Sequence, residues 1–167
     1  AGRGQLDGAD DTMQTNALKL IVLTDLHMVP QGETILGVDP AQRLDAALEH
    51  IALHHADAAR LMITGDLTHY GDEESYRRLR GSLARCPIPV TLMLGNHDNR
   101  AAFRMAFPDA PTDASGFIQS IVDVGDWRLI SLDSLFEQAV TPDACDAHSG
   151  ELCDRRLAWL DAALQSA

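Results

Sequence analysis

The stretch LKLIVLTDLH at residues 18–27 decides the fold, because an almost unbroken apolar run ends abruptly in Thr24-Asp25-Leu26-His27. The same pattern returns as LMITGDLT at 61–68 and as VTLMLGNHD at 90–98. Apolar runs with little alternation are typical of strands covered on both faces, as in a parallel sheet. Each run therefore predicts a buried strand that breaks into a polar loop, and parallel α/β folds build their sites just beyond such strand ends.

Two amphipathic stretches separate these runs. Asp39-Pro40 is typical of an N-cap and first helical residue, and that helix should end near His54-His55. Asp72 starts a second helix, which Cys86-Pro87 ends. Short connections of this kind predict a parallel β-α-β-α-β unit with right-handed crossovers. The expected strands are 18–24, 60–64 and 90–94.

The pattern changes after the third run. Val124-Gly125-Asp126 separates two strand-like stretches, which predicts an antiparallel hairpin. The expected elements are a short helix at 101–107, hairpin strands at 117–123 and 127–133, and a helix at 152–165 with Leu157, Leu160 and Leu164 on one face. The fold class is therefore α/β.

Length and composition predict one soluble globular domain. The chain has 167 residues, of which 46% are hydrophobic, and no run approaches the ~18 apolar residues of a membrane span. A net charge of −12 disfavours a nucleic-acid-binding patch and an anionic membrane surface. It is compatible with a phosphorylated substrate, because bound divalent cations reverse the local sign. The composition leaves open whether the protein forms a homo-oligomer.

The N-terminal end and the cysteines predict a cytoplasmic protein. Residues 1–17 are rich in Gly and Asp and lack the apolar core of a signal peptide, so we interpret them as a tag-like or disordered tail before a domain at 18–167. The chain has an odd number of cysteines, and they lack the spacing of a disulfide framework. This favours reduced thiols at Cys86, Cys145 and Cys153.

The polar residues at the strand ends favour a metal site when they are taken together. Asp25 or Asp66 alone at a strand end is more often a cap for a loop or helix than a ligand. Three such motifs follow three consecutive parallel strands, however, and their carboxylate, amide and imidazole groups meet at one edge of the sheet. Oxygen and nitrogen donors without thiolate suit Mn, Fe, Zn or Co.

The set Asp25-x-His27, Gly65-Asp66 and Gly95-Asn96-His97-Asp98 resembles the calcineurin-like metallophosphoesterase superfamily. Gly32-Glu33 with Gly37, and the helix that contains Trp159-Leu160-Asp161, resemble its class III cyclic-nucleotide and glycerophosphodiester phosphodiesterases. The resemblance covers about residues 18–164. It implies the N-terminal part of a four-layer αββα sandwich.

The resemblance also implies a role for each residue of the motifs. Asp25 and His27 bind a first metal ion, Asp66 bridges two ions, and Asn96 binds the second. His97 faces the substrate and helps to protonate the leaving oxygen, while Asp98 holds the His97 ring in the correct tautomer. We also expect substrate contacts from Asn96, His97 and His69. Two metal ions that activate a bridging hydroxide fit the hydrolysis of a small phosphodiester.

One departure from the family pattern leaves alternatives open. Members of the family carry a further ligand histidine and a Gly-His-x-His motif, whereas the only histidine after His97 is His148. We expect the N-terminal part of a longer polypeptide. The alternatives are a phosphomonoesterase of the same fold, or a non-catalytic scaffold if the chain truly ends at Ala167.

Several other residues have two interpretations. His69 and Tyr70 could contact substrate or belong to a solvated loop, and Arg100 and Arg104 could meet a phosphate or be surface residues. The loop 30–37 is a candidate wall of the substrate pocket. Two further groups could bind metal, but the sequence favours ordinary polar positions for both. They are the pair His50 and His54, and a zinc loop formed by Cys145, His148 and Cys153.

Overall fold

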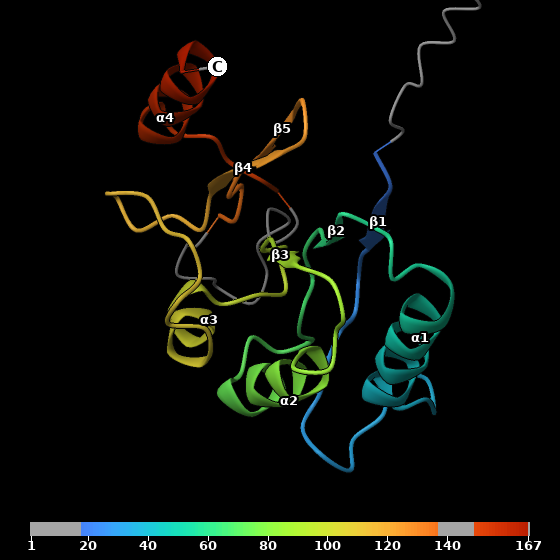
Figure 1. Cartoon of the computed structure of the whole chain (residues 1–167). Coiled ribbons are helices and arrows are strands. Elements are labelled where there is room, and N and C mark those ends of the chain that lie inside the picture. The colour runs from blue at the N-terminus through green and yellow to red at the C-terminus, as the bar shows by residue number, and fades with distance from the viewer. Residues whose placement is uncertain (1–17, 137–148, 167) are drawn as a thin grey trace, which may run out of the picture.

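A three-stranded parallel sheet lies at the centre of the fold. The computed structural model describes residues 18–136 and 149–166, and the expected tail at 1–17 lies outside this range. Strands β1 (Leu20–Leu23), β2 (Arg60–Ile63) and β3 (Val90–Leu92) are parallel in the order β1-β2-β3, with Ile21 opposite Leu61 and Leu61 opposite Val90 (Figure 1). The predicted β-α-β-α-β unit is confirmed.

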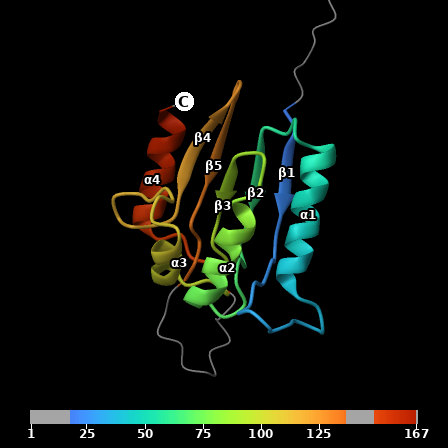
Figure 2. The same ribbon diagram turned by 60° about the horizontal axis from the view of Figure 1, so that its bottom comes forward.

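Helices α1 (Pro40–His54) and α2 (Glu73–Leu83) cover one face of this sheet (Figure 2). Both predicted N-caps form: the Asp39 carboxylate accepts the amide of Ala41 at 3.0 Å, and that of Asp72 accepts the amide of Ser75 at 2.9 Å. The helical faces that meet the sheet carry the residues that the 3.6-residue period selects. The buried set includes Leu44, Leu48, Ile51, Tyr76 and Leu79.

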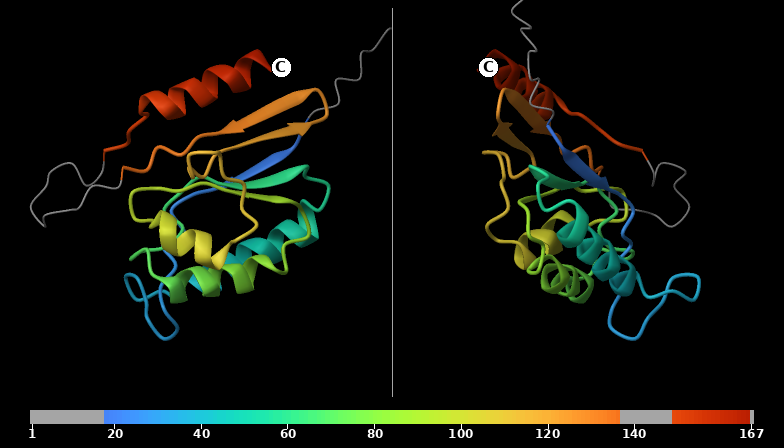
Figure 3. Two further views of the ribbon diagram at one scale, coloured as in Figure 1. Left: turned by 90° about the vertical axis from the view of Figure 1, so that its left-hand side faces the viewer. Right: turned by 45° about the vertical axis from the view of Figure 1, so that its right-hand side comes forward.

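Two further layers, a hairpin and a helix, lie on the other face of the sheet. After α3 (Arg100–Ala106), strands β4 (Ser120–Val124) and β5 (Trp127–Ser131) form the predicted antiparallel hairpin, and α4 (Asp154–Gln165) covers it. In Figure 3, α4, the hairpin, the parallel sheet and helices α1 to α3 follow one another as four layers. The predicted α/β/β/α arrangement is thus confirmed.

The hairpin is shorter than the sequence suggests because a side chain replaces main-chain pairing at its open end. Asp133 is fully buried, and its carboxylate accepts the amides of Ile118 and Leu135 as well as the guanidinium of Arg100. Pairing therefore stops at Ser131 rather than at Asp133.

Helix α4 packs through a face that the sequence did not single out. Leu157 and Leu164 share a face as predicted, yet they are 47% and 59% exposed. The buried residues are Arg156 and Ala163, seven positions apart. Arg156 donates to the carbonyl oxygens of Asp133 and Leu135, so hydrogen bonding selects the face that meets the hairpin. Among the described helices, none is long and apolar enough to cross a membrane.

Candidate metal centre

The backbone takes a left-handed conformation at three of the predicted ligands. The φ angles are +55° at Asp25, +46° at His27 and +48° at Asp66. Non-glycine residues rarely adopt this conformation, and it costs of order 1–3 kcal/mol where the surroundings impose it. Such strain concentrates at functional sites.

Main-chain hydrogen bonds impose this conformation. Beyond the ends of β1 and β2, the amides of Asp25, His27 and Met28 donate to the carbonyl oxygens of Gly65, Asp66 and Leu67 at 3.2, 2.9 and 3.0 Å. The amide of His69 returns a bond to the Met28 carbonyl oxygen at 2.9 Å. The first two motifs therefore stay paired after the regular strands have ended.

The side chains of Asp25, His27 and Asp66 converge. One ligand atom from each lies within 4.8 Å of the other two. Nε2 of His27 is 3.8 Å from Oδ1 of Asp25 and 3.9 Å from Oδ2 of Asp66. Two carboxylates and an imidazole form a donor set that divalent transition metals accept. The structure thus brings together three of the four metal ligands expected from the sequence.

The third motif packs against the side chain of Asp66. The amide of His97 donates to Oδ1 of Asp66 at 3.1 Å, and a Cβ at Gly95 would overlap the Asp66 carboxylate, so only glycine fits there. Asn96, the fourth expected ligand, is exposed on the same loop. Asp66 therefore faces the first motif with one oxygen and the third with the other.

Asp98 is buried between the loops after β2 and β3. Its buried carboxylate accepts hydrogen bonds from the amides of Leu67, Thr68 and Gly95, and from the hydroxyls of Thr68 and Tyr76. Burial raises the pKa of Asp98, against the lowering effect of these bonds. Asp98 thus holds the loop after β2 to the loop after β3.

The ring of His97 contacts the main chain of the loop after β2, while its orientation by Asp98 stays a prediction. Nδ1 of His97 lies 3.0 Å from the main-chain carbonyl oxygen of His69. Because a carbonyl oxygen only accepts, Nδ1 carries the proton and Nε2 holds the lone pair in the neutral ring. The backbone of the neighbouring loop therefore contributes to the orientation of the imidazole.

His69 stands beside both other histidines of the site. Its Nδ1 is 3.4 Å from Nδ1 of His27, and its ring is stacked on that of His97 with centroids 5.3 Å apart. Desolvation lowers the pKa of His69, and the charges of His27 and His97 lower it further. The structure places His69 in the site, whereas its neighbour Tyr70 is 61% exposed.

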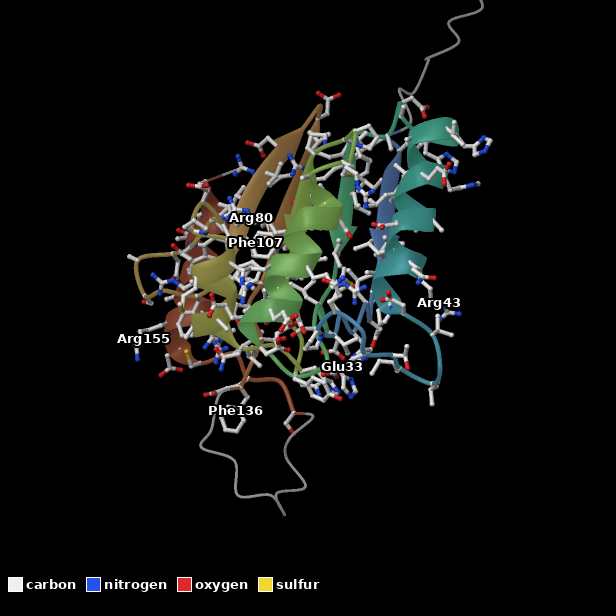
Figure 4. The ribbon with its side chains drawn as sticks, turned by 90° about the horizontal axis from the view of Figure 1, so that it is seen from below. Glu33, Arg43, Arg80, Phe107, Phe136 and Arg155 are labelled. Carbon is white, nitrogen blue, oxygen red and sulfur yellow. The ribbon has the colours of Figure 1, made fainter. Side chains whose placement is uncertain are left out.

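A hollow of about 470 Å³ adjoins the first motif. Asp25 and His27 line it together with Ile35, Leu36 and Arg43, so the predicted loop at 30–37 supplies part of its wall. Figure 4 labels Arg43 on α1 and Glu33 on the preceding loop. The volume lies in the range of small-molecule sites.

Sequence reasoning missed two contributors to the site. Arg43 belongs to an otherwise ordinary helix, and nothing in its spacing marks it as a wall of the hollow. Tyr76 lies on the buried apolar face of α2, yet its hydroxyl donates to Asp98 and accepts the amide of Asn99, both at 2.9 Å. A tyrosine in an apolar stripe is the one signal that a buried polar partner exists.

The other sequence candidates lie apart from the converged ligands. Arg100 pairs with Asp133 at 2.8 Å, and Arg104 is exposed on α3. His50 and His54 are exposed on α1, with ring centroids 4.5 Å apart. The suggested zinc loop rests on Cys145 and His148, which lie outside the described residues.

The fold and the strand-end motifs define a metallophosphoesterase. Residues 18–150 match the calcineurin-like phosphoesterase family, and the chain belongs to it. The probable cyclic nucleotide phosphodiesterase of Rhodopseudomonas palustris is 45% identical over 150 residues, which are 90% of this chain and 53% of that protein. The 3′,5′-cyclic adenosine monophosphate phosphodiesterase CpdA of Pseudomonas aeruginosa is 34% identical over 94% of this chain and 54% of its own length.

A solved structure shares the fold. The purple acid phosphatase PPD1 from yellow lupin seeds matches 90% of this chain and 28% of its own, with a TM-score of 0.57 and 14% sequence identity. The chain spans about half the length of the curated relatives it matches. Membership of the family implies divalent metal ions, and the donor set at Asp25, His27 and Asp66 fits them.

Proposed function

We propose that this site binds two divalent metal ions, and that the protein hydrolyses phosphodiester bonds in a small substrate such as a cyclic nucleotide or a glycerophosphodiester. The observation that carries the proposal is the convergence of Asp25, His27 and Asp66, each on strained left-handed backbone. The names of the similar bacterial proteins support a cyclic nucleotide as the substrate.

In this proposal Asp25 and His27 would hold the first ion, Asp66 would contact both, and Asn96 would contact the second. The two directions of the Asp66 carboxylate support its bridging role, because Oδ2 faces His27 and Oδ1 faces the loop of Asn96 and His97. Two bound ions supply Lewis-acid contact with the phosphoryl oxygens and a nucleophile at neutral pH. Mn, Fe, Zn and Co are the metals that suit these donors.

His97 acts on the leaving group. Its Nδ1–H is bonded to the His69 carbonyl oxygen, so Nε2 is the atom that would take a proton from solvent and donate it to the departing alkoxide. General-acid catalysis of this kind contributes about 10²–10⁴ in rate. Asp98 is a positioning residue, because it acts by fixing the two loops that carry Asp66 and His97.

The hollow beside Asp25 receives the rest of the substrate. Ile35 and Leu36 offer apolar contact, and Arg43 offers a positive charge to an anionic ester. A small, partly apolar phosphodiester fits a hollow of about 470 Å³ better than a polymer does. We propose that the protein lies in the cytoplasm. The free thiols of Cys86 and Cys153 support this location.

Hydrolysis of an aryl phosphodiester in the presence of Mn²⁺ tests the proposal. We expect turnover of bis(p-nitrophenyl) phosphate to exceed that of p-nitrophenyl phosphate. Asp66→Asn should lower it by about 10²–10³, as the loss of one electrostatic stabiliser does. Asp126→Asn changes an exposed carboxylate in the hairpin turn and is the matched control.

Three outcomes would contradict the proposal. Faster turnover of the monoester would indicate a phosphomonoesterase. Equal activity of Asp66→Asn and Asp126→Asn would place the reaction elsewhere. A metal-free protein without activity, after incubation with each of the four metals, would indicate a scaffold.

A further inference from the structure

Three imidazoles in the site form a second group of potential ligands. One ring nitrogen from each of His27, His69 and His97 lies within 4.8 Å of the other two, and all three side chains are half-buried. They come from the loops after β1, β2 and β3, so no single motif reveals the group. From this geometry we infer a second, all-nitrogen metal position that competes with the carboxylate-bound position at Asp25, His27 and Asp66.

The spacing of two nitrogens supports a shared cation. Nδ1 of His27 and Nδ1 of His69 are 3.4 Å apart. Metal–nitrogen bonds of about 2.0–2.1 Å at a tetrahedral angle place two ligands about 3.3–3.4 Å apart. The two nitrogens form a hydrogen-bond contact in this structure, and their separation also allows both to bind a common metal ion.

His97 supplies the third donor. Its Nδ1–H is bonded to the His69 carbonyl oxygen, so the neutral ring offers Nε2. The His97 ring lies 4.7 Å from the His27 ring, nearly perpendicular to it, and is stacked on the His69 ring. Three neutral imidazoles favour Zn²⁺, Co²⁺, Ni²⁺ or Cu²⁺ over Mg²⁺ or Ca²⁺.

The two metal positions exclude each other at His27. Nε2 of His27 faces Asp25 and Asp66, whereas Nδ1 faces His69. A neutral imidazole has one lone pair, so it ligates through one nitrogen at a time. An ion held by the three imidazoles therefore removes His27 from the carboxylate position and occupies the lone pair of His97. This makes the all-nitrogen position inhibitory, a conclusion that rests on the proposed hydrolysis at the carboxylate position.

Zn²⁺ titration of the metal-free protein labelled with ¹⁵N-histidine tests the inference. The His50→Gln variant is used as the parent, because it removes the exposed pair that His50 forms with His54. We expect the ring nitrogens of His27, His69 and His97 to shift together. Shifts confined to His27 would overturn the inference.

Two further variants separate the positions by their Zn²⁺ and Mn²⁺ affinities. His69→Gln keeps the main-chain carbonyl that holds His97 and should weaken Zn²⁺ binding by at least about tenfold while changing Mn²⁺ binding by less than about twofold, whereas Asp25→Asn should weaken Mn²⁺ binding more than Zn²⁺ binding. If His69→Gln does not fold, His97→Gln gives the same comparison. The reverse order of the two effects would overturn the inference. The readout is binding rather than hydrolysis, so failure of the proposed function leaves this result interpretable.

Discussion

Gly65→Ala tests how closely the second and third motifs approach. The Cβ of alanine would lie 2.8 Å from the Gly95 nitrogen, 3.0 Å from the Gly95 Cα and 3.1 Å from the Leu94 carbonyl carbon. All three atoms belong to the main chain, so no side chain can rotate away. The loop after β3 must move, and with it Asn96 and His97.

The magnitude has two parts. The φ angle of Gly65 is +115°, and an L residue held there costs about 1–3 kcal/mol. Overpacking against fixed atoms adds about 1–3 kcal/mol. We therefore expect Gly65→Ala to lower the free energy of unfolding by about 2–6 kcal/mol. Gly125→Ala is the matched control, because its φ is +57° with no atom within 4 Å, and it should cost only about 1–2 kcal/mol.

Urea unfolding followed by far-ultraviolet circular dichroism measures both free energies. Mn²⁺ affinity of each variant should then fall for Gly65→Ala and stay unchanged for Gly125→Ala. Equal losses of stability in the two variants would refute the close approach of residues 65 and 95. An unchanged Mn²⁺ affinity in a destabilised Gly65→Ala would refute its link to the site.

Three further perturbations test other contacts. Asp98→Ala should cost more than about 3 kcal/mol in urea unfolding, because it leaves the buried amides of Leu67 and Thr68 and the part-buried amide of Gly95 unpaired at about 1–3 kcal/mol each, whereas Tyr76→Phe should cost about 1–2 kcal/mol. Similar losses would contradict this account. The Arg78 hydrogen bond lowers the pKa of Asp39 below its ordinary 3.8, so its stabilisation is present above that pH and is lost as the pH falls through the folded-state value. The stability difference between the parent and Asp39→Asn should therefore shrink on acidification below pH 3.8, and a constant difference would refute it. Asp25→Asn should abolish most of the Mn²⁺-dependent turnover, measured at saturating metal, and full activity would remove Asp25 from the site.

The sequence predicts the edge of the sheet but not the bonds that shape it. Asp25, Asp66 and Asn96 follow apolar runs, so period and spacing place them at one edge. The hydrogen-bond partner of Nδ1 of His97 cannot be found in this way. It is a main-chain carbonyl 28 positions away, and every residue has such a group.

Helix α4 gives the same lesson for the fold. Its bounds follow from composition, and the prediction of 152–165 is within two residues of Asp154–Gln165. Its packed face depends on Arg156, whose long side chain reaches carbonyl oxygens near Asp133. An apolar stripe indicates a packed face only when no buried polar contact competes with it.

The paired main chain beyond β1 and β2 has a consequence for metal exchange. The bonds from His27, Met28 and His69 to the opposite loop need no cation, so the site keeps its shape when a chelator removes its metal. Small zinc domains, by contrast, unfold under the same treatment. The amide hydrogens of these residues should therefore exchange slowly with deuterium in the metal-free protein. Metals could then be swapped in one preparation without a refolding step.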